Sequence, residues 1–434
     1  MEKKIQPKTL KGFKDYFAQD VEIREYIKDT FKNLAQIYGY EGLETPSLEY
    51  SNLILGISGE EAEKLYYRFK DNGGRDVMLK YELMTSMCRA VAQNINNIQM
   101  PYKRYQIQNV WRADNVQKGR LREFTQMDID ILGSQSLFCD AEILEIGLRF
   151  LQKLGFKEYI ARINNRKILA GILDYLEIPQ THFDGFYTSV DKLNKIGEEE
   201  VKKELVSLRG IPKEKTDEIM EILKLKTLDD LKRNIGSTQI GKEGIEETEQ
   251  IFSILNETDL PVSSYIFDIT LARGLASYTG PIWEYEIVDK NIGSIAGGGR
   301  YDKIISRYVN QNIYATGVSF GLERIQEILK QENMFGTKLN NCDVLVIPMD
   351  SKSIKYSIQT AQKLRSKGIR TMVYPEIKKL SSVFKYADKK GFPWVIIIGE
   401  NEITSKCIQL KNMRTKEQFS AIPEEAVKII SSKQ

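Results

Sequence analysis

The chain has 434 residues, 41% of them hydrophobic and 28% charged, which is typical of a globular protein with two or three domains. No apolar run approaches the roughly 20 residues of a membrane-spanning helix, which excludes a protein that crosses a bilayer by such helices. The N-terminal segment lacks the apolar core of a signal peptide, and the four cysteines stand alone. We therefore expect a cytoplasmic protein without a disulfide framework or a cysteine-bound zinc.

The formal net charge of +3 is unevenly distributed along the chain. Residues 341–434 carry 17 Lys and Arg against 9 Asp and Glu, a net charge of +8, which leaves −5 on residues 1–340. A basic terminal part suggests nucleic acid binding, and a well-solvated surface would explain the charges equally well. The single histidine, His182, excludes a metal site built from several histidines, and we expect it in a surface turn outside catalysis.

The first hundred residues predict one helix followed by short strands. Apolar residues recur every three or four positions over residues 20–38, which predicts an amphipathic helix. In the next strand, Pro46 favours a position at a sheet edge. Asn72 and Gly73 predict a hairpin turn, and the returning strand ends at Glu82, just before a helix.

Residues 102–133 predict two antiparallel strands joined by a loop with three cations around a glycine. Period-two alternation places four residues of the second strand on one face: Phe124, Gln126, Asp128 and Asp130. Two interpretations fit this pattern. One is a hairpin with a solvated polar face. The other is a pocket floor, where Arg112 and the loop cations bind phosphates and the carboxylates bind a polar substrate.

The composition and periodicity of the sequence change twice in the middle of the chain. Residues 159–260 are rich in Lys and Glu with little strand alternation, which predicts an inserted helical module. Strand-like sequence returns at residues 265–280. We therefore expect one domain formed by residues 1–158 and 261–330, interrupted by the insertion.

The end of the chain predicts a second domain. Residues 317–325 run from a glycine-spaced strand into a helix, and the polar residues 331–341 predict a linker. Strands and helices then alternate over residues 342–434, which predicts a small, mostly parallel α/β domain.

The strongest resemblance lies in the predicted hairpin. Arg112 ends one strand, the loop contains Gly-Arg-Leu-Arg-Glu-Phe at residues 119–124, and Gln126 and Asp130 follow. This arrangement resembles motif 2 of the class II aminoacyl-tRNA synthetases, in the form found in histidyl-tRNA synthetases.

Other segments resemble the same family. Residues 273–280, Arg-Gly-Leu-Ala-Ser-Tyr-Thr-Gly, are similar to a motif specific to the histidyl enzymes. Residues 317–325 resemble motif 3, and the first helix with the strand around Pro46 resembles motif 1. The resemblance extends over nearly the whole chain and is weakest in the helical insertion.

The resemblance implies a fold and an activity. The fold would be an α+β catalytic domain with the antiparallel sheet of class II synthetases, a helical insertion, and a small α/β anticodon-binding domain. The activity would be the ligation of L-histidine to tRNA(His) through a histidyl-adenylate formed with ATP. Mg²⁺ would bind the ATP phosphates, with no metal ligand assigned to a protein side chain. The chain would form a homodimer.

The resemblance also implies roles for individual residues. Arg112 and Arg273 would be the catalytic residues at the α-phosphate, because the guanidinium group binds pairs of phosphate oxygens and stays charged. The implied ATP-binding residues are Arg112, Arg120, Phe124 and Arg324. The implied histidine-binding residues are Glu82, Gln126, Asp130, Arg273, Ser277 and Tyr278.

Some positions differ from those usual in the family, and all surround the expected amino acid pocket: Lys80, Tyr81, Met84, Ala276 and Ser277. Two alternatives therefore stay open. One is a non-catalytic, histidine-sensing regulator of the ATP phosphoribosyltransferase type, although such proteins typically lack the Arg-Gly-Leu arginine and the terminal α/β domain. The other is a synthetase paralogue with a different amino acid substrate.

Overall fold

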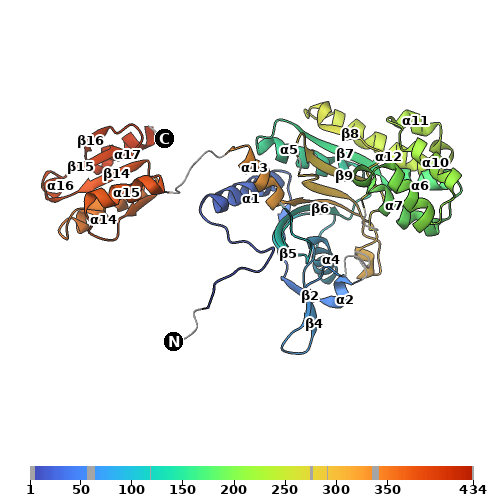
Figure 1. Cartoon of the computed structure of the whole chain (residues 1–434), viewed down its shortest axis with the longest axis horizontal. Helices are drawn as coiled ribbons and strands as arrows, with labels where there is room; N and C mark the ends of the chain where they lie inside the picture. The colour runs from blue at the N-terminus through green and yellow to red at the C-terminus, as the bar shows by residue number, and fades with distance from the viewer. Residues whose placement is uncertain are drawn as a thin grey trace. The chain divides into compact units, whose positions relative to one another are not determined.

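Figure 1 shows the computed structural model of the chain, which describes residues 5–55, 64–117, 119–273, 277–290, 292–334 and 342–432. Residues 274–276 of the Arg-Gly-Leu segment and residues 335–341 of the expected linker lie outside these ranges. The chain forms two compact units, Met1–Asp15 with Arg24–Glu332 and Tyr16–Ile23 with Asn333–Gln434.

The larger unit is built on an eight-stranded sheet with the order β1-β5-β6-β11-β10-β9-β7-β8. Neighbouring strands are antiparallel except at the two edges, where β1 pairs with β5 and β8 pairs with β7 in parallel. The strands are β1 (Glu41–Gly42), β5 (Tyr102–Trp111), β6 (Glu123–Leu132), β7 (Tyr159–Asn165), β8 (Tyr265–Phe267), β9 (Pro281–Ile287), β10 (Ala296–Arg300) and β11 (Ala315–Gly321). This largely antiparallel sheet with helices confirms the predicted fold class.

Helices cover one face of this sheet and form the core there. They are α1 (Gln19–Ile37), α5 (Phe138–Lys153) and α13 (Leu322–Gln331). The Phe150 ring of α5 lies 5.2 Å from both Phe31 of α1 and Phe320 of β11. The Tyr285 hydroxyl of β9 donates to the Leu144 carbonyl oxygen of α5 at 3.1 Å. Because side chains alternate along a strand, the neighbours of these residues point to the opposite face.

A small second sheet precedes the hairpin, with the order β2-β4-β3. Its strands are β2 (Leu48–Tyr50), β3 (Arg68–Lys70) and β4 (Asp76–Leu79). Helix α2 (Ser51–Ile54) comes directly after β2, and helix α4 (Leu83–Gln93) comes after β4. The predicted turn at Asn72 and Gly73 joins β3 to β4, and the Asp71 carboxylate accepts from the Gly73 and Arg75 amides at 2.9 Å. These hydrogen bonds to the Asp71 side chain stabilise the turn between the two short strands.

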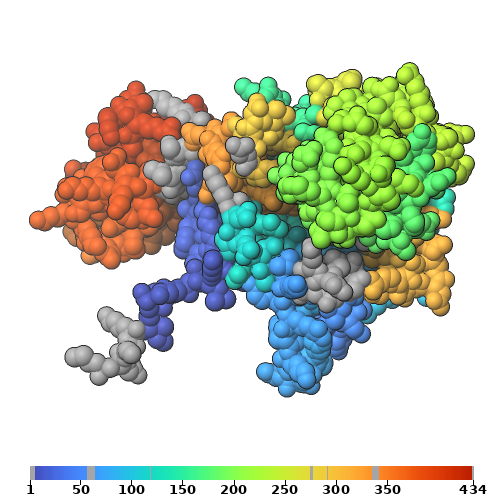
Figure 2. All heavy atoms as spheres, turned by 45° about the vertical axis from the view of Figure 1, so that its right-hand side comes forward, coloured from blue at the N-terminus to red at the C-terminus, as the bar shows by residue number. Residues whose placement is uncertain are grey.

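The insertion is helical but begins later than predicted. Its helices are α6 (Arg166–Tyr175), α7 (Phe183–Val190), α8 (Leu193–Ile196), α9 (Glu198–Lys203), α10 (Lys213–Ile222), α11 (Leu228–Lys232) and α12 (Gln239–Asn256). They share one apolar core that includes Leu169, Phe186 and Leu205, and they form a packed block in the space-filling view (green in Figure 2). Residues 159–165, which we assigned to the insertion, are instead β7, because they pair with β9 and β8 within the large sheet.

The smaller unit has a five-stranded sheet in the order β13-β12-β14-β15-β16. The elements are β12 (Val344–Pro348), α14 (Ile354–Arg365), β13 (Thr371–Val373), α15 (Leu380–Lys390), β14 (Trp394–Ile398), α16 (Glu400–Ser405), β15 (Ile408–Asn412), β16 (Gln418–Ala421) and α17 (Pro423–Ser432). The α/β class is as predicted. The sheet is mixed rather than mostly parallel, because β15 and β16 form an antiparallel hairpin on β14.

The Asn412 side chain explains this hairpin. Its Oδ1 accepts from the Arg414 amide at 2.8 Å and from the Thr415 amide at 3.0 Å, and Lys416 adopts a φ of +65°. Asparagine and a left-handed residue make a tight reversal between strands. None of the described helices has both the length and the apolar character that crossing a bilayer requires.

Candidate functional site

The free face of the large sheet carries a row of side chains that runs across six strands. In strand register, Gln106 pairs with Asp128, Asp128 with Ser319, Ser319 with Gly297, Gly297 with Glu284, and Glu284 with Arg162. Residues paired in this way point to the same face. The row places an acidic strand, β6, at one side of two glycine-containing strands and an acidic residue of β9 at the other.

Three glycines in the middle of this face form a strip of bare backbone, here called the glycine trough, which side chains from other segments fill. A Cβ at Gly317 would lie 1.9 Å from Asp130 Oδ1, and a Cβ at Gly297 would lie 1.3 Å from Arg273 Nη1. A Cβ at Gly299 would lie 2.8 Å from the Tyr278 ring. The sheet can therefore carry these functional side chains flat against its backbone only because the three positions have no side chain.

Arg273 reaches the trough from the loop after β8. Its Nη1 donates to the Trp283 carbonyl oxygen and to Glu284 Oε1, both at 3.1 Å, and its guanidinium lies 5.6 Å from the Tyr278 ring centre. The residue adopts a φ of +49°, a left-handed conformation that costs free energy in any residue other than glycine. Fixed contacts with β9 compensate for this strain and aim the cation into the trough.

Asp130 is held from two sides by the protein. Its Oδ2 lies 2.6 Å from Arg104 Nη2, and its Oδ1 accepts from the Tyr301 hydroxyl. The Arg104 side chain is completely buried. Burial raises the pKa of Asp130, and the charge of Arg104 opposes that rise. Asp130 Oδ1 therefore has a hydrogen-bond partner, whereas Oδ2 is close to the Arg104 cation but accepts no hydrogen bond from the described residues.

Gln126 and Asp128, in contrast, each present an open acceptor. Gln126 Nε2 donates to the Ser319 hydroxyl at 2.8 Å, while Gln126 Oε1 is buried and has no hydrogen-bond partner within the described parts of the chain. Asp128 Oδ1 is buried in the same way and has no partner there either. Burial raises the pKa of Asp128, Arg104 opposes this rise, and the charge of Asp130 adds to it.

Glu82 lies at the start of α4 and caps that helix. Its two carboxylate oxygens lie 3.0 and 3.1 Å from the Thr85 amide nitrogen, which donates to them. Burial raises the pKa of Glu82, whereas the bonds from Thr85 and the charge of Arg112 lower it. Glu82 therefore caps α4, and this cap fixes its carboxylate where the charge of Arg112 acts on it.

Three arginines meet at the other end of the site. The Arg112 guanidinium lies between two rings, 4.3 Å from the Tyr81 ring centre and 5.2 Å from the Phe124 ring centre. Arg120 forms an ion pair with Asp114 at 3.1 Å and is half exposed. Arg324 donates to the Ser294 carbonyl oxygen, and a Cβ at Gly119 of the loop would lie 3.4 Å from its side chain.

The electrostatics of this end favour an anion. Burial lowers the pKa of Arg324, and the charges of Arg120 and Arg112 lower it further. Three cations that repel one another in a partly buried cluster are stabilised when a multiply charged anion binds between them. A triphosphate would fit this cluster, and Phe124 lies beside it with an aromatic face next to Arg112.

The structure thus brings together most of the residues predicted to form the site. Ser277 is partly exposed next to Tyr278, and Ala276 lies outside the described residues. Four further side chains on this face were not predicted: Arg104, Glu284, Tyr301 and Ser319. Period-two alternation did place Asp128 on the pocket face of β6, but it could not show that its partner strand begins almost 190 residues later.

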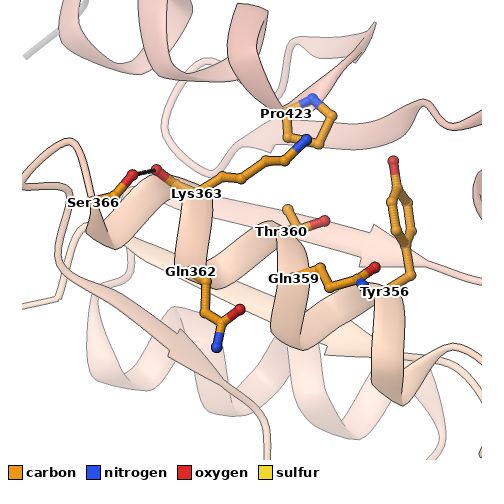
Figure 3. Close-up of a pocket in the computed structure, with 7 residues that line it drawn as sticks. All are labelled: Tyr356, Gln359, Thr360, Gln362, Lys363, Ser366 and Pro423. Atoms are coloured by element: carbon orange, nitrogen blue, oxygen red, sulfur yellow. Dashed lines mark hydrogen bonds between the residues drawn. The ribbon is translucent and has the colours of Figure 1, made fainter.

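A second hollow lies in the smaller unit, beside α14 and the first residue of α17 (Figure 3). It is lined by Tyr356, Gln359, Thr360, Gln362, Lys363, Ser366 and Pro423. Lys363 is its only charged residue and pairs with Glu424 at 2.6 Å. It contains no cluster of reactive side chains, so the chemistry of the chain is expected on the large sheet.

Comparison with known proteins identifies the family. A family model described as histidyl-tRNA synthetase matches residues 12–325, and one described as an anticodon binding domain matches residues 343–433. The chain belongs to the histidyl-tRNA synthetase family. It is 37% identical over 440 residues to the histidine–tRNA ligase of Clostridium tetani, covering 99% of both chains. It is 35% identical over 427 residues to that of Helicobacter hepaticus, covering 96% of this chain and 97% of the relative.

Solved structures agree with this histidyl-tRNA synthetase assignment. The histidyl-tRNA synthetase from Nostoc sp. PCC 7120 superposes with a TM-score of 0.87 at 26% identity, over 99% of this chain and 100% of that one. An ATP phosphoribosyltransferase regulatory subunit/histidyl-tRNA synthetase from Bacillus halodurans superposes with a TM-score of 0.74 at 20% identity, over 88% and 97%. The second likeness concerns the fold alone.

Proposed function

We propose that this histidyl-tRNA synthetase family member ligates L-histidine to tRNA(His) through a histidyl-adenylate. The observation that supports the proposal is that cationic groups and hydrogen-bond acceptors occupy different parts of the glycine trough. Three arginines converge at one end, buried acceptors that suit an amino acid lie on β6, and Arg273 pairs with Glu284 of β9 on the same face. A site of this kind can hold two anionic groups in line for reaction.

In the first step, the histidine carboxylate attacks the α-phosphate of ATP and pyrophosphate leaves. Arg112 and Arg273 would flank the α-phosphate, where the fixed guanidinium groups stabilise charge that develops during the displacement. Arg120 and Arg324 would bind the β- and γ-phosphates, and Phe124 would stack on adenine. Mg²⁺ would neutralise negative charge on the ATP phosphates, with no protein side chain assigned as its ligand.

Specificity would come from the opposite end of the trough. Glu82 and Gln126 would bind the amino group, and Asp130 with Tyr278 would bind the imidazole ring, with Ser277 at the border of the pocket. In the second step, the acyl group passes to the terminal ribose of the tRNA. The smaller unit, which matches an anticodon binding domain, would contact the anticodon.

The regulator alternative is not favoured. Arg273 is present and directed into the trough, and the terminal unit that matches an anticodon binding domain is present too. The paralogue alternative is addressed by the decisive experiment, which is ATP–pyrophosphate exchange with each of the twenty amino acids. We expect histidine to give the fastest exchange. Faster exchange with another amino acid would assign the chain to the paralogue class.

We further propose that the protein is a homodimer in the cytoplasm. Tyr50, Val77 and Phe69 lie in one row across the small sheet, and Tyr50 and Phe69 are 53% and 46% exposed. Large exposed aromatic side chains in one row are typical of an interface. The four free cysteines suit a reducing compartment.

Sedimentation tests the dimer. We expect the wild-type chain to sediment as a dimer and the double variant Tyr50→Glu, Phe69→Glu to sediment as a monomer, because two buried carboxylates would oppose association. The matched control is Val262→Glu, which changes an exposed apolar residue outside the small sheet. A double variant that remains dimeric would show that another surface forms the interface.

A further inference from the structure

The main chain of Arg273 is held by a second arginine, to which neither the family resemblance nor the proposed function gives a role. Arg166 is the first residue of α6, directly after β7, and is 5% exposed. Its Nη1 donates to the Ala272 carbonyl oxygen at 3.2 Å and to the Arg273 carbonyl oxygen at 3.4 Å. Nη1 carries two N–H groups, so it can donate to both oxygens at once.

These contacts lie where the backbone is strained. Arg273 has a φ of +49°, and such a conformation in a residue other than glycine persists only where the surroundings fix it. The side chain of Arg273 is fixed by acceptors on β9, whereas its carbonyl group is held by Arg166. The direction of the Arg273 cation therefore depends on Arg166 as well as on β9.

The end of β7 anchors the whole stretch that leads to Arg273. Asn164 Nδ2 donates to the carbonyl oxygens of Ile269 at 3.0 Å and of Leu271 at 2.8 Å. Arg166 binds the next two carbonyl oxygens, and its backbone amide donates to the Gly280 carbonyl oxygen at 2.9 Å. Arg166 thus contacts both ends of the segment 273–280.

The Arg166 guanidinium also packs on the helical insertion. Its Cζ lies 3.5 Å from the centre of the Tyr187 ring of α7, a close cation–π contact. Tyr187 is 8% exposed and packs against Phe183 at 6.2 Å and Phe186 at 5.8 Å, which belong to the same helix. Burial lowers the pKa of Arg166, and Tyr187 and Asp184 of α7 oppose this fall. Helix α7 therefore stabilises the Arg166 cation in a fixed position.

One guanidinium thus contacts both the insertion and the main chain of Arg273. A shift of α7 would move Arg166 and change the two carbonyl contacts. Misplacing a catalytic group by about 1 Å can lower a rate roughly a hundredfold. We propose that Arg166, packed on Tyr187, is a positioning residue that sets the conformation of Arg273 and makes adenylate formation depend on the helical insertion. This proposal rests on the proposed function, since it assumes that Arg273 acts at the α-phosphate.

A double-mutant cycle in the full-length protein tests this role. We expect Arg166→Met to lower the kcat of histidine-dependent pyrophosphate exchange about 10- to 100-fold, because Arg273 loses its fixed position. The KM for ATP should stay within about twofold, because the residues proposed to bind the β- and γ-phosphates are unchanged. In an Arg273→Ala background, Arg166→Met should lower the rate by less than about twofold, since the group that it positions is already absent.

Two variants of Tyr187 test the contact with the insertion. Tyr187→Phe keeps the aromatic face and should retain the wild-type kcat, whereas Tyr187→Ala should lower kcat about 3- to 30-fold, as for loss of a cation–π contact. The matched control is Ile219→Ala in α10, another buried residue of the same apolar core. It should lower the melting temperature, as Tyr187→Ala should, and leave kcat unchanged.

Amide hydrogen exchange gives a measurement that does not depend on activity. Exchange at residues 269–273 should become faster in Arg166→Met and Tyr187→Ala, because the carbonyl contacts that anchor this stretch are lost or weakened. It should stay unchanged in Ile219→Ala. If Arg166→Met does not fold, Tyr187→Ala takes its place in the cycle with Arg273→Ala.

The outcomes are distinct. A folded Arg166→Met protein with wild-type kcat would overturn the inference, and so would an equal loss of rate in the wild-type and Arg273→Ala backgrounds, which would indicate a general structural role. Absence of histidine-dependent exchange in the wild-type protein would overturn the proposed function instead. In that case hydrogen exchange at residues 269–273 still decides. Faster exchange in Arg166→Met and Tyr187→Ala but not in Ile219→Ala supports the positioning role, and any other pattern overturns it.

Discussion

The guanidinium group of Arg273 occupies the space in which any side chain at position 297 would begin. Gly297 lies on β10, far from Arg273 in sequence, and a Cβ there would meet Nη1 at 1.3 Å. The same guanidinium needs the left-handed backbone of Arg273 and the acceptors of β9. Gly297, which has no side chain to take part in the reaction, therefore helps to position Arg273, the residue proposed for catalysis.

This dependence gives the first prediction. We expect Gly297→Ala to reduce the rate of histidine-dependent exchange about 100- to 1000-fold, as Arg273→Ala should, because each removes a preorganised cation from the developing charge. Exchange rates and melting temperatures are the measurements. Gly73→Ala, at an exposed turn with room for a methyl group, should retain wild-type exchange. Near-normal exchange by Gly297→Ala would remove Arg273 from the chemistry.

The second prediction concerns Lys80, which is only 1% exposed. Its Nζ donates to Gln108 Oε1 at 2.8 Å and to the Thr45 carbonyl oxygen at 3.1 Å. Burial lowers the pKa of Lys80 from 10.5 to about 8. Between these two pH values the unfolded chain holds a proton that the folded chain has lost, so the free energy of unfolding rises with pH across this window.

Urea unfolding at pH 7.5, 8.5 and 9.5 measures this effect. We expect the stability of the wild-type protein to increase relative to that of Lys80→Met over this range, because methionine cannot titrate. Parallel pH profiles for the two proteins would show that the folded state does not lower the pKa of Lys80.

Sequence patterns predicted the positions and contacts of individual side chains only in part. Alternation along β6 correctly placed Gln126, Asp128 and Asp130 on one face, because that periodicity is a local property of a strand. It did not show which of the carboxylates has an open oxygen. That depends on Arg104, Tyr301 and Ser319, which belong to other strands or loops and meet β6 only in the folded protein.

At the scale of elements, one buried network joins two helices to the central hairpin. Arg24 of α1 binds Glu323 of α13 at 2.8 Å and Thr125 of β6 at 2.8 Å. The Glu323 carboxylate also accepts from the Thr125 amide at 3.0 Å. Arg324 follows Glu323 directly, so the network fixes the start of the helix that carries a phosphate-binding candidate.

The third prediction tests this network. Arg24→Ala should lower the free energy of unfolding by about 3–5 kcal/mol, because it leaves the buried Glu323 carboxylate without its cation. The double variant Arg24→Met, Glu323→Leu should lose less, since neither charge then remains. Denaturant unfolding of both variants is the measurement. A double variant that is less stable than Arg24→Ala would contradict this account.

Helices and turns with a strong local sequence pattern were predicted correctly. Strands whose formation depends on pairing with distant strands were not. The amphipathic helix predicted for residues 20–38 is α1, and the turn predicted at Asn72 and Gly73 joins β3 to β4. Residues 159–165 were assigned to the insertion because their flanking sequence is helical. Their strand form depends on β9, more than a hundred residues away.

At the scale of the molecule, the division into two units gives the fourth prediction. A chain that ends at Met334 should retain histidine-dependent exchange and lose most tRNA charging, because the large sheet contains the proposed site and the removed part carries the basic charge. Exchange and charging assays on the same preparation measure both. Loss of both activities in a folded product would show that the terminal unit is not a separable tRNA-binding module.

The junction of β6 and β11 has a consequence for biosynthesis. Asp128 of β6 pairs in the sheet with Ser319 of β11, which is synthesised 191 residues later. At about 5–20 residues per second, the ribosome needs roughly 10–40 s to make that stretch. During this time one edge of the β5–β6 hairpin is open to pairing with other nascent chains. Asp128 and Asp130 would then face like charges in a second copy, which disfavours such pairing. We therefore expect these carboxylates also to disfavour aggregation of the unfinished sheet.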